Sequence, residues 1–322
     1  MTSLIRLLPF VALLATPAAG LADQAKPPHP SEVAGARFDM TVEPAQTVRI
    51  DGYDWDHQYT VALPATYAAQ PDRQYPTLWV TDSPLMFRLT VGLVNLLAQG
   101  GEIPEMIVVG IGLPGALDTL TYGRRRWNDF GPPGATFFFD GPGGTVIEQM
   151  MRSYGLGEPP QKADVFLSFL VDELRPTLSE TYRMSHDHGL FGHSAGGLFT
   201  AYAMFARPLT FKRYIVGSPV VNMVDRAVFR LEEKVANEHD DLPITVFFGA
   251  GEQEIDDYVG SSWGIVSSPI LLAETLHLRK YPSINVRTRV FPGKNHFTVV
   301  PDIIADGLRF VYAQPDDDAD AQ

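Results

Sequence analysis

Apolar and polar residues alternate in two early segments of the chain, residues 46–50 (QTVRI) and 57–64 (HQYTVALP). A period of two is typical of antiparallel strands with one buried face. Further along, the pattern changes to short runs that are apolar throughout, as strands buried on both faces are. These runs predict strands over residues 75–83, 105–114, 188–194, 212–219, 244–252 and 285–293.

Segments with apolar residues at helical spacing lie between these runs. They predict helices over residues 84–99, 163–182, 195–205, 226–237, 269–278 and 298–312. Apolar strands that alternate with helices indicate an α/β fold with a mostly parallel central sheet and helices on both faces. Because the chain shows no internal repeat and no break in this alternation, we expect one domain over residues 46–313.

One segment departs from this order. Residues 115–161 are rich in glycine and proline and carry three successive arginines, Arg124, Arg125 and Arg126. A connection of this length usually has a function, so we expect an insertion near the pocket, with Arg126 as a candidate substrate contact. Two other interpretations stay open: the insertion decorates the surface, and the arginines form a solvated face.

The two ends of the chain have patterns of their own. Residues 1–22 combine Arg6, a short apolar run and a cluster of small residues, which is typical of a secretory signal peptide. A membrane anchor is the alternative, but the run is short and Pro9 interrupts it. We expect a secreted or periplasmic protein with a flexible leader over residues 23–45 and an acidic disordered tail over residues 314–322.

Composition removes several classes of function. The 322 residues are 45% hydrophobic, enough for a large core, and include no cysteine, which excludes disulfides, thiol catalysis and a cysteine-ligated zinc. The net charge of −13 argues against nucleic acid as a partner. His186 and His188 have a spacing seen in metal sites, but a turn explains it better. We expect no metal and no cofactor.

The stretch Gly192-His193-Ser194-Ala195-Gly196 fits the motif G-x-S-x-G. In the nucleophile elbow this motif places a serine on a tight strand-to-helix turn with its hydroxyl exposed. Small residues are needed because side chains at Gly192 and Gly196 would collide with the turn or the adjoining strand. We predict that Ser194 is the nucleophile and that the Ala195 N–H stabilises an oxyanion. His193 is a candidate substrate contact, with its side chain directed away from Ser194.

A second match to the motif, GSSWG at residues 260–264, is centred on Ser262. No apolar strand leads into it, Trp263 would crowd the turn, and no amphipathic helix follows at once. We therefore predict a loop here.

A serine hydroxyl needs a base, and the base needs an orienting acid. In α/β-hydrolases the order along the chain is serine, acid, histidine. His296 follows the last predicted strand and precedes the last predicted helix, so we predict that it is the base. The acid is expected after the strand ITVFFGAG, where Glu254 is preferred. The alternatives are Glu252, Asp256, Asp257 and, after the preceding strand, Asp225.

A second oxyanion donor is expected from the loop after an early strand. The run TLWVTDSP ends at such a point. We predict that the donor is the Ser83 N–H, because Pro84 has no N–H, and that Asp82 braces the loop.

With these residues in place, the chain resembles a family of esterases with the α/β-hydrolase fold, which includes siderophore trilactone esterases, S-formylglutathione hydrolases, feruloyl esterases and mycolyltransferases. The similarity extends over most of the chain, from about His57 to Tyr312. The segments that carry it are YPTLWVTDS, RRRWNDFGPP, FLVDELRPTLSETYR, GAGEQE, GKNHFTVVP and FGHSAGGLFTAYAMFARPLTFKRYIVGSP, the last being most similar to the siderophore-esterase branch.

The resemblance implies a triad of Ser194, Glu254 and His296, with Ser83 and Ala195 as oxyanion donors. Residues 220–222 (VVN) replace an aromatic pair of that branch, and the 115–161 segment is longer and richer in glycine than expected. These departures concern the substrate and not the triad.

We therefore expect an exported serine esterase that forms an acyl-enzyme on Ser194 and releases the acid with water. A siderophore-type lactone or ester is the preferred substrate. A carboxylesterase acting on small acyl or feruloyl-type esters is one alternative, and transfer of the acyl group to an acceptor other than water is another. A secreted binding protein on a hydrolase scaffold is the alternative from a different class, since fold does not fix function.

Overall fold

The computed structural model describes residues 27–115, 117–134, 149, 161–221 and 226–313. The expected signal peptide over residues 1–22, the acidic tail over residues 314–322 and most of the 115–161 segment lie outside the described residues.

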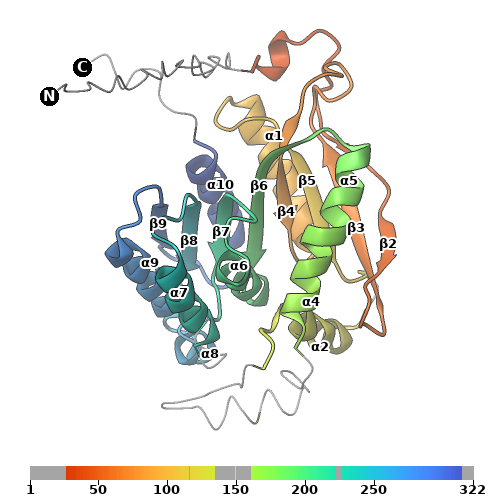
Figure 1. Cartoon of the computed structure of the whole chain (residues 1–322). Helices are drawn as coiled ribbons and strands as arrows, with labels where there is room; N and C mark the ends of the chain where they lie inside the picture. Colours follow the sequence, from red (N-terminus) through yellow and green to blue (C-terminus); the bar gives the residue numbers. More distant parts are fainter. Residues whose placement is uncertain (1–26, 116, 135–148, 150–160, 222–225, 314–322) are drawn as a thin grey trace, which may run out of the picture.

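Within the described residues, nine strands form one sheet in the order β1-β3-β5-β4-β6-β7-β8-β9, and β2 pairs with β3 (Figure 1). The strands β4 to β9 are parallel to one another, whereas β1, β2 and β5 each run antiparallel to β3. This arrangement confirms the expected antiparallel start and parallel remainder. The bounds are β1 (Thr41–Val42), β2 (Gln46–Arg49), β3 (Asp56–Leu63), β4 (Tyr75–Val80), β5 (Ile107–Gly112), β6 (Met184–His193), β7 (Arg213–Gly217), β8 (Thr245–Gly251) and β9 (Asn285–Phe291).

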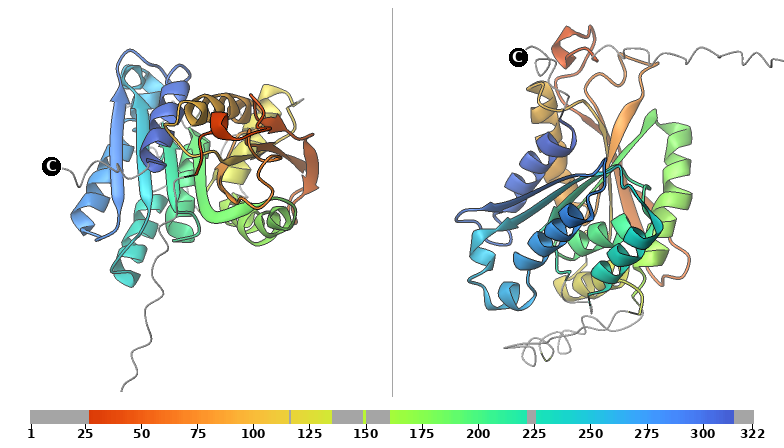
Figure 2. Two further views of the ribbon diagram at one scale, coloured as in Figure 1. Left: turned by 90° about the horizontal axis from the view of Figure 1, so that it is seen from above. Right: turned by 60° about the vertical axis from the view of Figure 1, so that its left-hand side comes forward.

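Helices cover both faces of the sheet, as Figure 2 shows from two further directions. On one face α1 and α10 pack together, and on the other α6 lies between β6, β7, α2, α4 and α7. The helical elements are η1 (Pro30–Glu32), α1 (Leu85–Gln99), α2 (Thr119–Phe130), α4 (Ala163–Ser168), η2 (Phe169–Leu174), α5 (Arg175–Thr181), α6 (Ala195–Ala206), α7 (Ala227–Glu238), η3 (Glu252–Glu254), α8 (Tyr258–Ser262), α9 (Ser267–Arg279) and α10 (Val300–Val311).

Each face of the sheet has its own apolar core because successive side chains of a strand point to opposite faces. In β4, Trp79 joins the core under α6, while Leu78 and Val80 join the core under α1 and α10. All three side chains are fully buried, and burial of one large apolar side chain stabilises the fold by about 1.5–3 kcal/mol. The strands in the middle of the sheet are therefore held firmly from both sides.

The order of strands reverses between β4 and β6. After β4 the chain adds β5 on one side of β4, then crosses to the other side to form β6, and β7 to β9 follow on that side. At such a switch point the loops that follow the two strands diverge and leave a crevice beyond their carboxyl ends. The loop after β4 begins at Thr81, and Ser194 follows β6 directly. The fold thus brings the predicted nucleophile and the predicted oxyanion loop together at this edge.

Three segments differ from the sequence-based expectations. Residues 119–130 form helix α2, which Asp118 caps by accepting hydrogen bonds from the N–H groups of Leu120 and Thr121. The expected helix over residues 163–182 contains a π-helical turn, η2, between α4 and α5. The segment containing Ser262 forms the short helix α8 instead of a loop.

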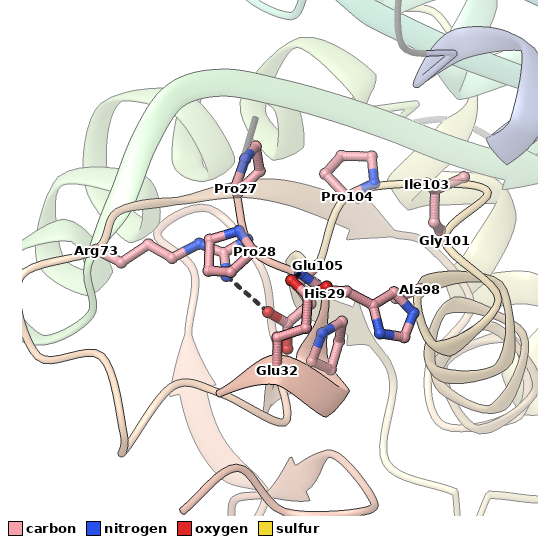
Figure 3. Close-up of a pocket in the computed structure, with 11 residues that line it drawn as sticks. Pro27, Pro28, His29, Glu32, Arg73, Ala98, Gly101, Ile103, Pro104 and Glu105 are labelled. Carbon is pink, nitrogen blue, oxygen red and sulfur yellow. Dashed lines mark hydrogen bonds and ion pairs between the residues drawn. The ribbon is translucent and has the colours of Figure 1, made fainter. Parts of the chain in front are cut away.

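The described part of the expected leader packs against the domain. His29 Nε2 lies 2.8 Å from the carbonyl oxygen of Gln99 at the end of α1, and the Arg37 N–H donates to the Ala65 carbonyl. Together with the ion pair between Arg73 and Glu105 (2.7 Å), the part of this segment around His29 lines an open pocket of about 390 Å³ (Figure 3). The pocket lies at the amino ends of β4 and β5, so it is remote from Ser194 at the carboxyl end of β6.

Candidate active site

Ser194 occupies the sharp turn between β6 and α6, with φ 61° and ψ −122°. This left-handed backbone is costly for a residue with a side chain and is characteristic of functional positions. The Ser194 N–H donates to the Gly217 carbonyl at 2.9 Å, and the Ser194 carbonyl accepts from the Leu198 N–H at 2.9 Å. The turn is therefore anchored both to the neighbouring strand β7 and to the first turn of α6.

The glycines around Ser194 are required by close backbone contacts. A Cβ on Gly192 would lie 2.1 Å from the Gly196 carbonyl oxygen, and a Cβ on Gly196 would lie 2.5 Å from Thr81 Oγ1. A Cβ on Gly197 would lie 2.5 Å from the carbonyl oxygen of Gly217. Each glycine allows the turn to approach a different neighbour: the start of α6, the end of β4 and the end of β7.

Glu254 and His296 lie together although 42 residues separate them. Glu254 ends the short helix η3 after β8, and its Oε1 is 2.5 Å from Nδ1 of His296, which follows β9. The Glu254 side chain is 2% exposed. With Nδ1–H donated to the carboxylate, the imidazole carries its lone pair on Nε2, the atom that accepts the proton of a nucleophile.

The alternative acids are engaged elsewhere. The Asp257 carboxylate caps α8 through the Val259 N–H, and Glu252 accepts a hydrogen bond from the Gly293 N–H. Asp256 is exposed, and Asp225 lies outside the described residues. Among the described candidates, Glu254 is the carboxylate that contacts His296.

Ser218 is a site residue that the sequence did not indicate. It follows β7 with φ 38°, and its hydroxyl donates to Glu254 Oε2 at 2.9 Å. The same oxygen accepts the Gly251 N–H at 2.6 Å. The Glu254 carboxylate therefore has three partners and is fixed on both oxygens. A serine directly after β7 was the available signal, but nothing in the sequence showed that it reaches β8.

His193 is buried and contacts the histidine loop. Burial lowers the pKa of His193 well below its usual value, and the neighbouring His296 lowers it further, so the ring is neutral. Its Nε2–H donates to the carbonyl oxygen of His296 at 2.9 Å, and the two ring centres are 4.6 Å apart. His193 therefore does not have the expected role of a substrate contact: its buried side chain packs against the ring of His296 and holds the backbone of the histidine loop.

The two predicted oxyanion donors have different surroundings. Ala195 is the first residue of α6, so its N–H has no partner within the helix and lies at the positive end of the helix dipole. The Ser83 N–H instead donates to the Ile111 carbonyl at 3.3 Å. The loop after β4 continues alongside β5, where Gly112 leaves room for it, and this pairing turns the Ser83 amide away from the expected role.

Arg126 also differs from its expected role as a substrate contact. Its guanidinium forms a two-pronged ion pair with Asp82, and its side chain is only 18% exposed. Arg125 lies over the ring of Trp55 at 5.2 Å. Two of the three successive arginines, Arg125 and Arg126, thus contact other side chains of the protein.

In the described ranges, no group of three or more His, Asp or Glu side chains is placed to hold a metal ion. No described helix is both long enough and apolar enough to cross a membrane. Gly260 of the second serine motif packs against the Glu254 carbonyl, where a Cβ would lie at 2.5 Å. That motif therefore supports the acid loop.

Comparison with known proteins gives consistent matches. The family described as "Putative esterase" matches residues 145–282. Ferri-bacillibactin esterase BesA of Bacillus subtilis (strain 168) is 24% identical over 285 residues, 86% of this chain and 92% of that protein. A siderophore enterobactin esterase of Emericella nidulans is 32% identical over 183 residues, 54% of this chain and 57% of that protein.

The solved structure of siderophore hydrolase EstA from Aspergillus nidulans matches with a TM-score of 0.70 at 19% identity, covering 89% of this chain and 97% of that one. This likeness confirms the α/β-hydrolase fold. Together with the strand-turn-helix that carries Ser194, the matches show a serine hydrolase acting on ester bonds, which over residues 145–282 is similar to the Putative esterase family.

Proposed function

We propose that the chain is an exported esterase that opens siderophore-type lactones or esters with a triad of Ser194, His296 and Glu254. The observation that carries the catalytic part is the bond between Glu254 and His296, which joins the loops after β8 and β9 at the same sheet edge as Ser194. The names of the relatives support the substrate class, since BesA acts on ferri-bacillibactin and the Emericella protein on enterobactin.

The reaction follows from the roles of the three side chains. His296 Nε2 accepts the Ser194 proton while Oγ bonds to the ester carbonyl carbon, and Glu254 stabilises the imidazolium that forms. The Ala195 N–H and the amino end of α6 stabilise the negative oxygen of the tetrahedral intermediate. When the intermediate collapses, the C–O bond breaks and His296 returns the proton to the leaving alcohol. Water then attacks the acyl-enzyme by the same route and releases the acid.

Surroundings of the triad favour a substrate with an apolar or aromatic part. Phe297 follows His296, packs edge-on against its ring at 5.6 Å and is 81% exposed. Ile255 and Tyr258, which follow Glu254, are also more than half exposed. Exposed apolar side chains next to a catalytic centre are typical of a ligand surface.

An ester panel tests the substrate. The purified chain is offered a catecholate trilactone, iron-free and ferric, a methyl feruloyl ester and p-nitrophenyl butyrate, and the products are followed by mass spectrometry. We expect the highest kcat/KM for a trilactone and loss of turnover in Ser194→Ala by several orders of magnitude. Preference for the feruloyl or butyryl ester would indicate a general carboxylesterase. Failure to hydrolyse any ester or to react with a fluorophosphonate would indicate a binding protein.

Export is tested separately. Expressed in a Gram-negative host, the protein is expected in the periplasmic or extracellular fraction with a mass that begins at Asp23, because the run of small residues ends there. A full-length, membrane-retained product would show that residues 1–22 form an anchor.

A further inference from the structure

We propose that Arg126 is a positioning residue of the esterase reaction, which clamps the loop after β4 to the peptide group immediately before Ser194. This inference rests on the proposed role of Ser194 as the nucleophile. It replaces the sequence-based expectation that Arg126 contacts the substrate.

Three short hydrogen bonds define the clamp. Arg126 Nε is 2.6 Å from Asp82 Oδ1, and Nη2 is 2.8 Å from Asp82 Oδ2. The same Nη2 donates to the carbonyl oxygen of His193 at 2.9 Å. One guanidinium on α2 thus joins the two diverging loops of the switch point. A planar fork of this kind fixes direction as well as distance, which a lysine cannot do.

The His193–Ser194 peptide is a sensitive place for such a contact. Its N–H, that of Ser194, donates to Gly217, and its carbonyl accepts from Arg126. With both polar atoms held, the peptide cannot rotate, and its orientation sets the direction of Ser194 Oγ and of the Ala195 N–H. Displacement of reacting groups by about 1 Å is enough to lower a rate by about 100-fold.

Charge is the second part of the argument. Asp82 is buried, with φ 57°, and its Oδ2 would lie 2.8 Å from a Cβ on Gly196, in the first turn of α6. An unpaired carboxylate there would oppose the negative oxygen that develops beside Ala195. Arg126 neutralises it. Although burial disfavours the charged guanidinium, the Asp82 carboxylate raises the pKa of Arg126 above its usual value, so the guanidinium stays charged.

Tyr122 completes the contacts of Asp82. Its hydroxyl donates to Asp82 Oδ1 at 3.2 Å, and burial followed by the charge of Asp82 raises the pKa of Tyr122, which keeps it protonated. Helix α2 therefore supplies two donors, one turn apart, to the same carboxylate. The helix serves to hold the loop after β4, which explains why the polar residues of its sequence are partly buried.

The neighbouring Arg125 provides a matched control, because it lies over Trp55 and away from this clamp. The experiment compares Arg126→Lys with Arg125→Lys, which both keep the net charge, and adds Arg126→Gln and Ser194→Ala. kcat and KM are measured on the neutral ester p-nitrophenyl butyrate, together with the thermal midpoint and the rate of labelling by a fluorophosphonate.

We expect kcat of Arg126→Lys to fall by about 100-fold, with KM within about threefold of wild type and slower labelling of Ser194. Arg126→Gln is expected to be more impaired, since it leaves Asp82 unpaired as well. Arg125→Lys should stay within about twofold of wild type in kcat. If Arg126→Gln fails to fold, the two lysine variants still decide the outcome.

Two results would overturn the proposal. One is a kcat of Arg126→Lys close to that of Arg125→Lys, and the other is a rise in KM at unchanged kcat, which would make Arg126 a direct substrate contact. Both are distinct from failure of the proposed function, which would appear as turnover that persists in Ser194→Ala.

Discussion

Replacing Glu254 by glutamine tests the acid with almost no change in shape. The two carboxylate oxygens of Glu254 have different partners: Oε1 faces His296 Nδ1, while Oε2 accepts from the Gly251 N–H at 2.6 Å and from Ser218. The backbone N–H of Gly251 is a fixed donor, so the amide oxygen of a glutamine must take the position of Oε2. Its NH₂ group then faces His296.

This orientation gives the histidine the wrong tautomer. An NH₂ group opposite Nδ1 requires Nδ1 to accept a hydrogen bond, so the ring proton moves to Nε2. A protonated Nε2 has no free lone pair and cannot accept the proton of Ser194. In a serine protease the corresponding acid-to-amide change lowers kcat by about 10⁴-fold, which is about 5.5 kcal/mol in the barrier. We expect Glu254→Gln to lose kcat by about this factor, with KM nearly unchanged because the ester is bound elsewhere.

The assay measures kcat and KM on one activated ester for Glu254→Gln beside Glu252→Gln, Asp256→Asn and Asp257→Asn. These three carboxylates lie on the same loop and are exposed, so their amide variants should lose only a few-fold through weak, screened electrostatics. Retention of more than about a tenth of wild-type kcat in Glu254→Gln would refute the tautomer argument. A crippled Asp256→Asn or Asp257→Asn would move the acid to that residue.

Two further predictions concern stability. Gly192→Ala places a methyl group 2.1 Å from the Gly196 carbonyl oxygen and should lower the free energy of unfolding by about 3 kcal/mol or more. Gly92→Ala on α1, with open space around it, should be neutral or stabilising. Denaturant unfolding compares the two variants, and equal stability would contradict the packing argument. Burial, followed by the charge of Arg175, lowers the pKa of His188 to about 4, so the folded state resists protonation and stability present above about pH 6.5 is lost as the pH falls toward 4. The loss from this residue is about 2 kcal/mol at pH 5, so His188→Gln should flatten the decline of unfolding free energy between pH 7 and pH 5, and an unchanged slope would contradict it.

The strands were predictable because central strands of this sheet are buried on both faces and read as continuous apolar runs. β4, β7 and β8 match their predicted segments to within a few residues at each end. Helix α2 was not predicted because Gly123 and the three successive arginines interrupt the helical spacing of its apolar residues. Asp118, which precedes the helix, is an ordinary N-terminal cap. Its partners lie in β3, the β4 loop and α6, which sequence spacing does not reveal.

Contacts between distant segments explain the remaining differences at the site. The direction of the Ser83 amide depends on how the β4 loop lies beside β5, which local sequence does not determine. His57 forms a buried pair with Asp129, which lies 72 residues further along the chain. Burial raises the pKa of Asp129 to about 6, an effect that only the folded environment creates. Ser218 reaches Glu254 for the same reason.

The position of the first and last described residues has a practical meaning for tethering. The described residues start at Pro27, beside the amino ends of β4 and β5. They finish just after Tyr312, whose ring contacts the guanidinium of Arg213 at the amino end of β7. Pro27 and Tyr312 therefore both lie on the side opposite the loops that carry Ser194, Glu254 and His296. A bead, surface or fused protein attached at either of these two positions would leave the catalytic edge pointing outward, so immobilised enzyme should still admit a large ester.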